Sequence, residues 1–185
     1  AGGFPAAQPF LEVKALEVAM AIENGADEVD IVLNAGRMLT GEYDEAANEV
    51  EVIRAEMDEE IVLKVIIESG VLKTPDLIRK ASLLSMFAGA DFIKTSTGKT
   101  DVSATPEAAV VMCHAIKDFY EKTGRKVGFK AAGGVRTPQD AVLYYTIVEE
   151  ILGREWCTPE LFRIGASSAA NNLISAIEGR EVKFF

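Results

Sequence analysis

A complete strand-and-helix unit can be read in residues 127–152, VGFKAAGGVRTPQDAVLYYTIVEEIL. Its first six residues are mostly apolar, as in a buried strand, whereas 138–152 repeats apolar residues with the period of about 3.6 that is typical of an amphipathic helix. Two glycines form the turn between them. Thr137-Pro138 marks the helix start, because threonine caps helix N-termini and proline at the next position loses no hydrogen bond. The stretch therefore predicts a β-strand followed by an α-helix.

The same unit recurs along the chain. Apolar, β-branched runs predict strands at 28–34, 61–69, 91–96, 127–132 and 162–166. Amphipathic patterns predict helices around 46–57 and over 75–88, 106–122, 138–152 and 168–178, and Thr-Pro pairs at 74, 105, 137 and 158 are expected to open helices. The strand onsets lie about 30 to 36 residues apart, the length of a βα unit with a right-handed crossover. The predicted fold class is α/β with a parallel sheet, in a single domain over residues 1–185.

Composition excludes several classes of protein. The chain has 185 residues, 49% of them apolar and 26% charged, with a formal net charge of -10. The apolar fraction is too high for a disordered chain, and the acidic balance argues against binding to nucleic acid or to an anionic membrane. No apolar stretch approaches the roughly 20 residues of a membrane span. Two cysteines are too few for a disulfide framework, so the cytoplasm is the expected location.

Nearly every expected strand carries a charge in its interior. These residues are Asp30, Lys64, Lys94 and Lys130, with Glu68 near the end of its strand. Strands of a parallel sheet are usually apolar throughout, because both faces are buried. If the alternating faces that carry the charges point to one interior, they assemble a cluster of three lysines and two carboxylates. The alternative is a set of edge strands whose lysine stems reach water, but three lysines in three consecutive strands favour the interior cluster.

A lysine crowded by other lysines has a particular chemistry. A second ammonium about 6.5 Å away, at an effective dielectric constant of about 20, disfavours the charged form of an amine by about 2.5 kcal/mol, and partial burial acts in the same direction. The pKa of such an amine falls, and its neutral form can attack a carbonyl to form a Schiff base. A carboxylate such as Asp30 can relay protons beside it. The cluster therefore predicts a Schiff-base site without metal or cofactor, with either Lys94 or Lys130 as the nucleophile.

Glycine and hydroxyl residues follow the last three expected strands. Glycines let backbone N–H groups approach an anion closely, and the N-terminus of a following helix adds its dipole. Ordinary turns have a similar composition, but such motifs after consecutive strands favour a phosphate site, as in β/α barrels. The motifs are Thr97-Gly98-Lys99, Ala132-Gly133-Gly134-Val135 and Gly165-Ala166-Ser167-Ser168.

Five segments together resemble the deoxyribose-phosphate aldolase family. The two lysine motifs are the most specific, and the other segments match the family in the same order along essentially the whole chain. The resemblance implies a TIM (β/α)8 barrel and a class I aldolase that interconverts 2-deoxy-D-ribose 5-phosphate with D-glyceraldehyde 3-phosphate and acetaldehyde. The segments are Asp27-Glu28-Val29-Asp30, Leu63-Lys64-Val65-Ile66-Ile67-Glu68, Asp91-Phe92-Ile93-Lys94-Thr95-Ser96-Thr97-Gly98-Lys99, Val127-Gly128-Phe129-Lys130-Ala131-Ala132-Gly133-Gly134-Val135 and Gly165-Ala166-Ser167-Ser168.

The resemblance also implies a role for each matched residue. Lys94 is implied as the Schiff-base lysine, Lys130 as the second lysine that favours its neutral form, and Asp30 as the proton relay. Lys64 is implied in the same polar cluster, among the substrate-binding residues. The remaining residues are expected to hold the phosphate and hydroxyl groups of the sugar: Thr97, Gly98, Lys99, Gly133, Gly134, Ser167 and Ser168.

Two features depart from the family pattern. Gly2-Gly3-Phe4-Pro5 is similar to the segment after the family's third strand, so only about five complete βα units are expected, too few to close an eight-stranded barrel. Unpaired strand edges next to the gap invite association, so we expect either a fragment of a longer protein or an opened barrel that another chain completes. A homo-oligomer is among the expected assemblies. The tail Lys183-Phe184-Phe185 lacks the terminal tyrosine of many relatives. The alternative functions are another Schiff-base or phosphosugar barrel enzyme, and an inactive phosphosugar-binding fragment.

Overall fold

The computed structural model of the chain describes residues 1–184, and Phe185 of the tail lies outside the described residues. None of the helices in residues 1–184 has the length and apolar character needed to cross a membrane. Helices and strands alternate as follows: α1 (Leu11–Glu23), β1 (Glu28–Val32), α2 (Ala35–Thr40), α3 (Tyr43–Ala55), β2 (Val62–Ile66), α4 (Ser69–Leu72), α5 (Pro75–Phe87), β3 (Phe92–Lys94), α6 (Pro106–Thr123), β4 (Gly128–Ala132), α7 (Pro138–Leu152), the 3-10 helix η1 (Arg154–Trp156), β5 (Phe162–Gly165) and α8 (Ala169–Glu178).

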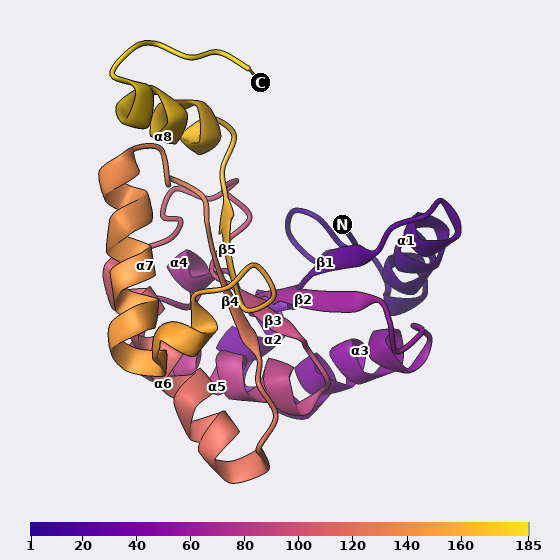
Figure 1. The fold of residues 1–185 in the computed structure, drawn as a ribbon. Coiled ribbons are helices and arrows are strands. Elements are labelled where there is room, and N and C mark those ends of the chain that lie inside the picture. The colour runs from indigo at the N-terminus through magenta and orange to yellow at the C-terminus, as the bar shows by residue number, and fades with distance from the viewer. Residues whose placement is uncertain (185) are drawn as a thin grey trace.

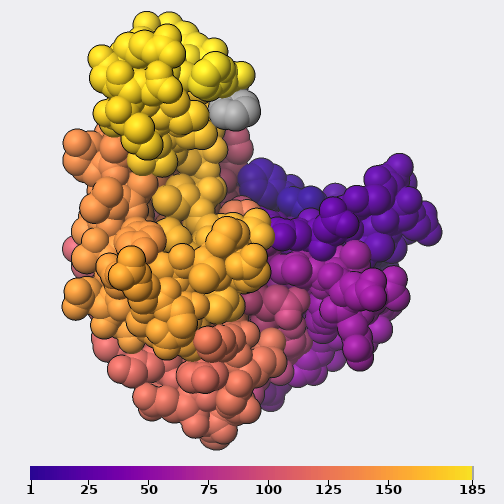
Figure 2. Space-filling view, in the orientation of Figure 1, coloured from indigo at the N-terminus to yellow at the C-terminus, as the bar shows by residue number. Residues whose placement is uncertain are grey.

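The five strands form one parallel sheet in the order β1-β2-β3-β4-β5, which confirms the predicted α/β class. The larger helices follow one another in an arc around its outer side, from α1 and α3 through α5 and α6 to α7 (Figure 1). Within residues 1–184, β1 and β5 are not paired with each other, so the sheet is open. Gly2 extends the edge of β1 by one parallel bridge to Ile31. The side away from the helices is hollowed between α8 and the N-terminal segment (Figure 2).

Alternation along the strands separates two kinds of side chain. The residues that point toward the helix layer are apolar and buried, because the helices cover this face with apolar stripes of their own. In α6, for example, the buried residues Ala109, Met112, Ile116 and Phe119 recur every three or four positions. The strand residues on this face are Val29, Ile31, Leu63, Val65, Ile93, Phe129 and Ala131. The opposite, concave face carries the charged residues.

Three of the four Thr-Pro pairs open helices as predicted. The side chains of Thr74, Thr105 and Thr137 each accept a hydrogen bond from a backbone N–H in the first turn of α5, α6 and α7. The prediction for Thr158 is wrong, because the chain turns there and enters β5 at Phe162. Only a few residues separate η1 from β5, which leaves no room for a helix.

Within residues 1–184, three α-helices and the 3-10 helix η1 were not among the helices predicted from the sequence. The largest is α1, whose residues Lys14, Ala15 and Val18 are buried on one side. The other two α-helices, α2 and α4, are short and directly follow β1 and β2. The strand β2 ends at Ile66 and is therefore shorter than the predicted strand 61–69, whose last residue, Ser69, is the first residue of α4.

Candidate active site

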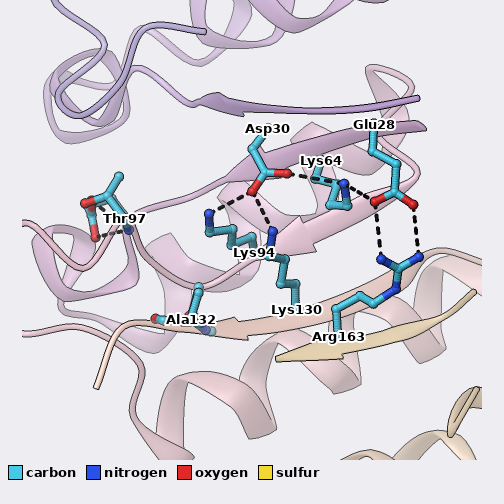
Figure 3. Close-up of polar contacts among 10 residues, drawn as sticks. Glu28, Asp30, Lys64, Lys94, Thr97, Lys130, Ala132 and Arg163 are labelled. Atoms are coloured by element: carbon cyan, nitrogen blue, oxygen red, sulfur yellow. Dashed lines mark hydrogen bonds and ion pairs between the residues drawn. The ribbon is translucent and has the colours of Figure 1, made fainter. Parts of the chain in front are cut away.

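A cluster of charged side chains occupies the concave face of the sheet (Figure 3). The strand register brings them together, because Asp30 pairs with Lys64, and Lys94 pairs with Lys130, which pairs in turn with Arg163. The face curves enough for side chains of β1 to reach those of β4 and β5. The prediction that the charged faces share one interior is confirmed for the three lysines and Asp30.

Asp30 is the centre of the cluster. Its Oδ2 atom accepts hydrogen bonds from the Nζ atoms of both Lys94 and Lys130, each at 2.7 Å. The two nitrogens therefore lie no farther apart than twice that distance. Oδ1 of the same carboxylate lies 3.3 Å from Nζ of Lys64. One carboxylate thus contacts three ammonium groups, and two of them share a single oxygen atom.

The ionisation of these groups follows from this crowding. Burial acts to raise the pKa of Asp30, but the hydrogen bonds and charges of Lys130 and Lys94 outweigh it and hold that pKa well below its usual range. The pKa of Lys130 is lowered, first by burial and further by the charges of Lys94 and Lys64, although Asp30 opposes the shift. Asp30 is therefore ionised at neutral pH, and Lys130 loses its proton more readily than a solvated lysine.

Glu28 and Arg163 extend the cluster toward the other end of the strands. Two guanidinium nitrogens of Arg163 contact the two carboxylate oxygens of Glu28, at 2.9 Å and 3.3 Å. Glu28 Oε2 also lies 2.6 Å from Nζ of Lys64. The Lys64 contact is the largest cause of a lowered pKa at Glu28. The ion pairs thus run without a break from β5 through β1 to β2 and back to Asp30.

A cavity of about 500 Å³ opens over Lys94 and Lys130. The exposed fractions of these two side chains are 12% and 18%, whereas that of Lys64 is only 3%. Lys94 and Lys130 therefore reach the cavity, and Lys64 lies behind them. The lining residues are Phe4, Lys94, Thr97, Gly98, Lys99, Lys130, Ala132, Gly133, Gly134, Val135, Arg136, Gly165, Ala166 and Ser167.

The cavity is cationic although the chain as a whole is acidic. Lys94, Lys99, Lys130 and Arg136 line it, and the lining contains no carboxylate. Ser167 lies on its wall, just before the N-terminus of α8, where the helix dipole favours an anion. The lining therefore suits a small anionic ligand that also reaches the two lysines.

A close approach of two loops shapes the wall of this cavity. Gly133 has a φ of +82°, and a β-carbon added there would lie 2.7 Å from the Ser103 side chain and 3.0 Å from the Cα of Gly98. Only glycine fits such a position without displacing its neighbours. The loops after β3 and β4 can therefore pack against each other beside the lysines.

Glu68 does not join the lysine cluster, contrary to the expectation from strand alternation. It has a φ of +52° and lies beyond the end of β2, so the alternation no longer applies to it. Its carboxylate instead accepts hydrogen bonds from Thr97 Oγ1 at 2.5 Å, from the Thr97 N–H and from Thr100 Oγ1 at 3.3 Å. Glu68 thus holds the loop that supplies Thr97, Gly98 and Lys99 to the cavity.

The structure gathers most of the residues expected at the site around one cavity. Lys94, Lys130 and six of the seven expected sugar-binding residues line it, namely Thr97, Gly98, Lys99, Gly133, Gly134 and Ser167. Asp30 and Lys64 lie in the cluster next to it, and Ser168 occupies the N-cap position of α8 outside the lining.

Sequence reasoning did not select Glu28, Arg163 or Arg136 for the site. Arg163 is a charged residue inside the predicted strand 162–166, so the rule that selected Lys94 and Lys130 applies to it as well. Glu28 is the first residue of the predicted strand 28–34, and the signal for it is that it alternates with Asp30 and so shares its face. Arg136 follows the glycines after β4 and gives no comparable signal. Its place on the cavity wall depends on the course of a loop.

Other parts of the structure offer less for chemistry. In the part of the chain from Ala1 to Phe184, His, Cys, Asp and Glu side chains form no group of three that could hold a metal ion. A second cavity of about 320 Å³, lined by residues such as Ser69, Val102 and Val111, contains none of the clustered lysines. We therefore take the cavity over Lys94 and Lys130 as the candidate active site.

Comparisons with known proteins identify the family of the chain. A model of the DeoC/LacD family aldolases matches residues 4–153. Deoxyribose-phosphate aldolases of Mus musculus and Homo sapiens are 48% and 46% identical over 173 residues, which is 94% of this chain but 54% of each of those proteins. The chain thus spans about half the length of these curated relatives.

Solved structures agree with the fold. The deoxyribose phosphate aldolase of Aeropyrum pernix, described as tetrameric, is 30% identical and superimposes with a TM-score of 0.73, covering 95% of this chain and 66% of that one. A putative deoxyribose-phosphate aldolase from Toxoplasma gondii, at 22% identity, matches in fold with a TM-score of 0.82 over 96% of this chain and 69% of that one. The five βα units are thus part of a TIM-barrel architecture, and the chain belongs to the DeoC/LacD family of aldolases.

Proposed function

We propose that the protein cleaves 2-deoxy-D-ribose 5-phosphate to D-glyceraldehyde 3-phosphate and acetaldehyde through a lysine Schiff base. One observation carries the proposal: two lysines share an oxygen of a partly buried carboxylate, beside a cavity whose lining includes four cationic residues and no carboxylate. The family match and the named relatives support the same reaction. Neither a metal nor a cofactor is part of this proposal.

Lys94 is the proposed nucleophile. Its Nζ, once neutral, attacks the aldehyde carbon of the open-chain sugar, and loss of water gives a protonated imine. Lys130 is the proposed proton acceptor, because its pKa is lowered and both amines touch Oδ2 of Asp30, so a proton can pass between them through one carboxylate. The choice of Lys94 over Lys130 rests on the family motif, since the geometry treats the two amines alike.

The imine then draws electrons from the carbon–carbon bond that breaks. The carbon of this bond that becomes the aldehyde of glyceraldehyde 3-phosphate carries a hydroxyl group, and the proton of that hydroxyl is transferred to the Asp30–Lys130 pair. Glyceraldehyde 3-phosphate then departs, and an enamine stays on Lys94. Protonation of the enamine carbon and addition of water release acetaldehyde and restore the amine. Apart from the water that is lost on imine formation and taken up again on hydrolysis, these steps require the protein to move protons, and the shared carboxylate is placed to do so.

The far wall of the cavity is the proposed phosphate site. Lys99, Arg136, Ser167 and the glycine loops after β3 and β4 line it, and the N-terminus of α8 follows Ser167. Cations and helix N-termini are the features that attract phosphate groups. Lys64 is buried behind the lysine pair, so the expectation that it binds substrate is not carried into the proposal.

Trapping of the Schiff base tests the proposal in this 185-residue chain. The chain is incubated with acetaldehyde and borohydride, and the adduct is located by peptide mass mapping. We expect an N-ethyl adduct that forms faster on Lys94 than on surface lysines at low aldehyde concentration. We also expect the chain to form glyceraldehyde 3-phosphate from 2-deoxy-D-ribose 5-phosphate. Exposed Lys117 serves as an internal control, because a solvated lysine reacts only slowly.

Two alternatives give different outcomes. Turnover of a ketose phosphate without turnover of the deoxyribose phosphate would indicate another Schiff-base aldolase. The open edge of the sheet favours the second alternative, a chain that binds a phosphosugar without cleaving it. That alternative predicts a higher melting temperature with the sugar phosphate but no adduct on Lys94. This pair of results would overturn the proposal.

We also propose that the protein works in the cytoplasm as a homo-oligomer. Cys113 and Cys157 are both free thiols, which suits a reducing compartment. Large apolar side chains at the start of α1 and along it are exposed and suit contact with another copy. They include Phe10, which directly precedes α1, and Leu16 and Met20 within it. Cell fractionation and light scattering test the two statements.

A further inference from the structure

We infer that Glu28, clamped by Arg163, is a positioning residue that keeps the ammonium group of Lys64 away from the oxygen of Asp30 shared by Lys94 and Lys130. Its catalytic consequence rests on the proposed function. The arrangement itself rests on the contacts described below and can be tested without substrate.

Lys64 lies between two carboxylates and is closer to Glu28 (Figure 3). Its Nζ is 2.6 Å from Oε2 of Glu28 and 3.3 Å from Oδ1 of Asp30. Glu28 itself is fixed by a two-point contact with Arg163, and such fork-to-fork pairs define both the position and the plane of a carboxylate. Glu28 therefore holds Lys64 at the Oδ1 side of Asp30 and leaves Oδ2 to the other two lysines.

Burial makes this contact consequential. Lys64 is almost completely buried, so its ammonium group cannot turn to solvent when Glu28 is removed. Its nearest remaining partner is Asp30, which already contacts Lys94 and Lys130. Without Glu28, Asp30 would be the only carboxylate left to Lys64, which would compete with Lys94 and Lys130 for the shared oxygen.

Lys130 reports the change. The charged groups that face it are Asp30 from β1, Lys64 from β2 and Lys94 from β3, with Arg163 beside it in register on β5. Loss of the Glu28 charge, or movement of Lys64 toward Asp30, makes the surroundings of Lys130 more positive. Both changes favour the neutral amine.

Residue-specific reductive methylation tests the arrangement. Formaldehyde and cyanoborohydride label neutral amines, and mass mapping gives the rate at Lys130 as a function of pH. In Glu28→Gln, we expect the pH midpoint for Lys130 to fall by about one unit. In Lys64→Met the midpoint should rise, and in the double variant it should return near that of the original chain, because a matched pair of charges has been removed.

The catalytic consequence has its own measurement. When the variants are compared at pH values that give the same fraction of neutral Lys130, Glu28→Gln should slow acetaldehyde trapping at Lys94 by about tenfold, and the double variant should recover most of the rate. Asp118→Asn is the matched control, since it breaks an equally short but exposed ion pair, with Arg79, far from the cavity. Neither measurement should change in this control.

The outcomes separate the inference from the proposed function. Failure of the original chain to form an adduct on Lys94, with the methylation midpoints shifted as expected, would refute the function and leave the positioning role of Glu28. An adduct in the original chain with the same midpoint and trapping rate in Glu28→Gln would refute the inference. Should Glu28→Gln not fold, Arg163→Lys keeps the charge but loses the two-point contact, and an unchanged midpoint there would refute it as well.

Discussion

The two faces of the sheet are built from the same five strands but serve different purposes. The face toward the helices carries apolar residues such as Ile31, Ile93 and Phe129, all fully buried. The concave face carries Asp30, Lys94 and other charged groups that satisfy one another across the curved sheet. Because successive residues of a strand point in opposite directions, neighbours in sequence can belong to a packed core and to a reactive site. Substitutions on the two faces should therefore separate stability from chemistry.

The largest effect is expected from Asp30→Asn. The amide cannot hold both ammonium groups or relay a proton, so the rate of Schiff-base trapping should fall by about 10² to 10⁴. Measurement of that rate in the variant and in the original chain tests this. A loss below threefold would contradict a central role of Asp30.

The same variant carries a pH dependence of stability. The pKa of Asp30 is lowered in the folded chain, so its contribution to stability is present above the pKa of an unfolded aspartate, about 3.9, and is lost as the pH falls through the folded value. The difference in melting temperature between the original chain and Asp30→Asn should therefore shrink below about pH 4. A constant difference between pH 7 and pH 3 would contradict this.

Ile93→Ala provides the matched change on the other face, next to Lys94 in the same strand. Truncation of a fully buried isoleucine should lower the free energy of unfolding by about 2 to 5 kcal/mol. The trapping rate per folded molecule should stay within a factor of about three, because no contact of Asp30 is lost. Denaturant unfolding and trapping at a temperature where the variant is folded give the two numbers. A large loss of trapping in the folded variant would mean that the two faces are not separable.

Glu68→Gln is expected to have a smaller effect, at the edge of the concave face. It weakens the hydrogen bonds that hold the Thr97 loop and should raise the KM for the sugar phosphate about tenfold, because the loop lines the cavity. The kcat should change less, since the lysine pair keeps its partners. Steady-state kinetics separates the two constants. A fall in kcat as large as the fall in kcat/KM would instead place Glu68 in the chemical step.

The smallest effects are expected at two Thr-Pro pairs in loops that join strands and helices. Thr105→Ala removes the N-cap of α6 and should lower the free energy of unfolding by about 1 kcal/mol. Thr158→Ala should have a smaller effect, because Thr158 precedes a turn instead of a helix. Chemical denaturation of both variants compares them directly. A greater loss at Thr158 would contradict the observed difference between the two Thr-Pro pairs.

The regular part of the fold was predictable from the sequence for a physical reason. A strand and its helix are local, and Thr137-Pro138 fixes the boundary between them by backbone chemistry alone. The α1 helix was missed although Leu11, Ala15 and Val18 recur at helical spacing, and its signal was therefore present. The Thr158 prediction failed because a dipeptide does not reveal how much chain follows before the next strand.

The lysine cluster was predictable because charge inside a parallel strand demands partners. Which residues pair with each other was less predictable. Glu68 leaves the cluster because the strand ends before it, and the contact of Glu28 with Arg163 joins the two edge strands across the curved sheet. Pattern along one strand gives the face of a residue. It does not give the curvature that decides which strands meet.

The titration of the Lys130 side chain tests the central claim most directly. Nitrogen NMR of labelled lysine side chains, assigned with Lys130→Arg, gives its midpoint in the original chain and in Lys94→Met. The account predicts a midpoint below the roughly 10.4 of a solvated lysine and a rise when the neighbouring charge of Lys94 is removed. A midpoint at the solvated value that does not respond to Lys94→Met would contradict it.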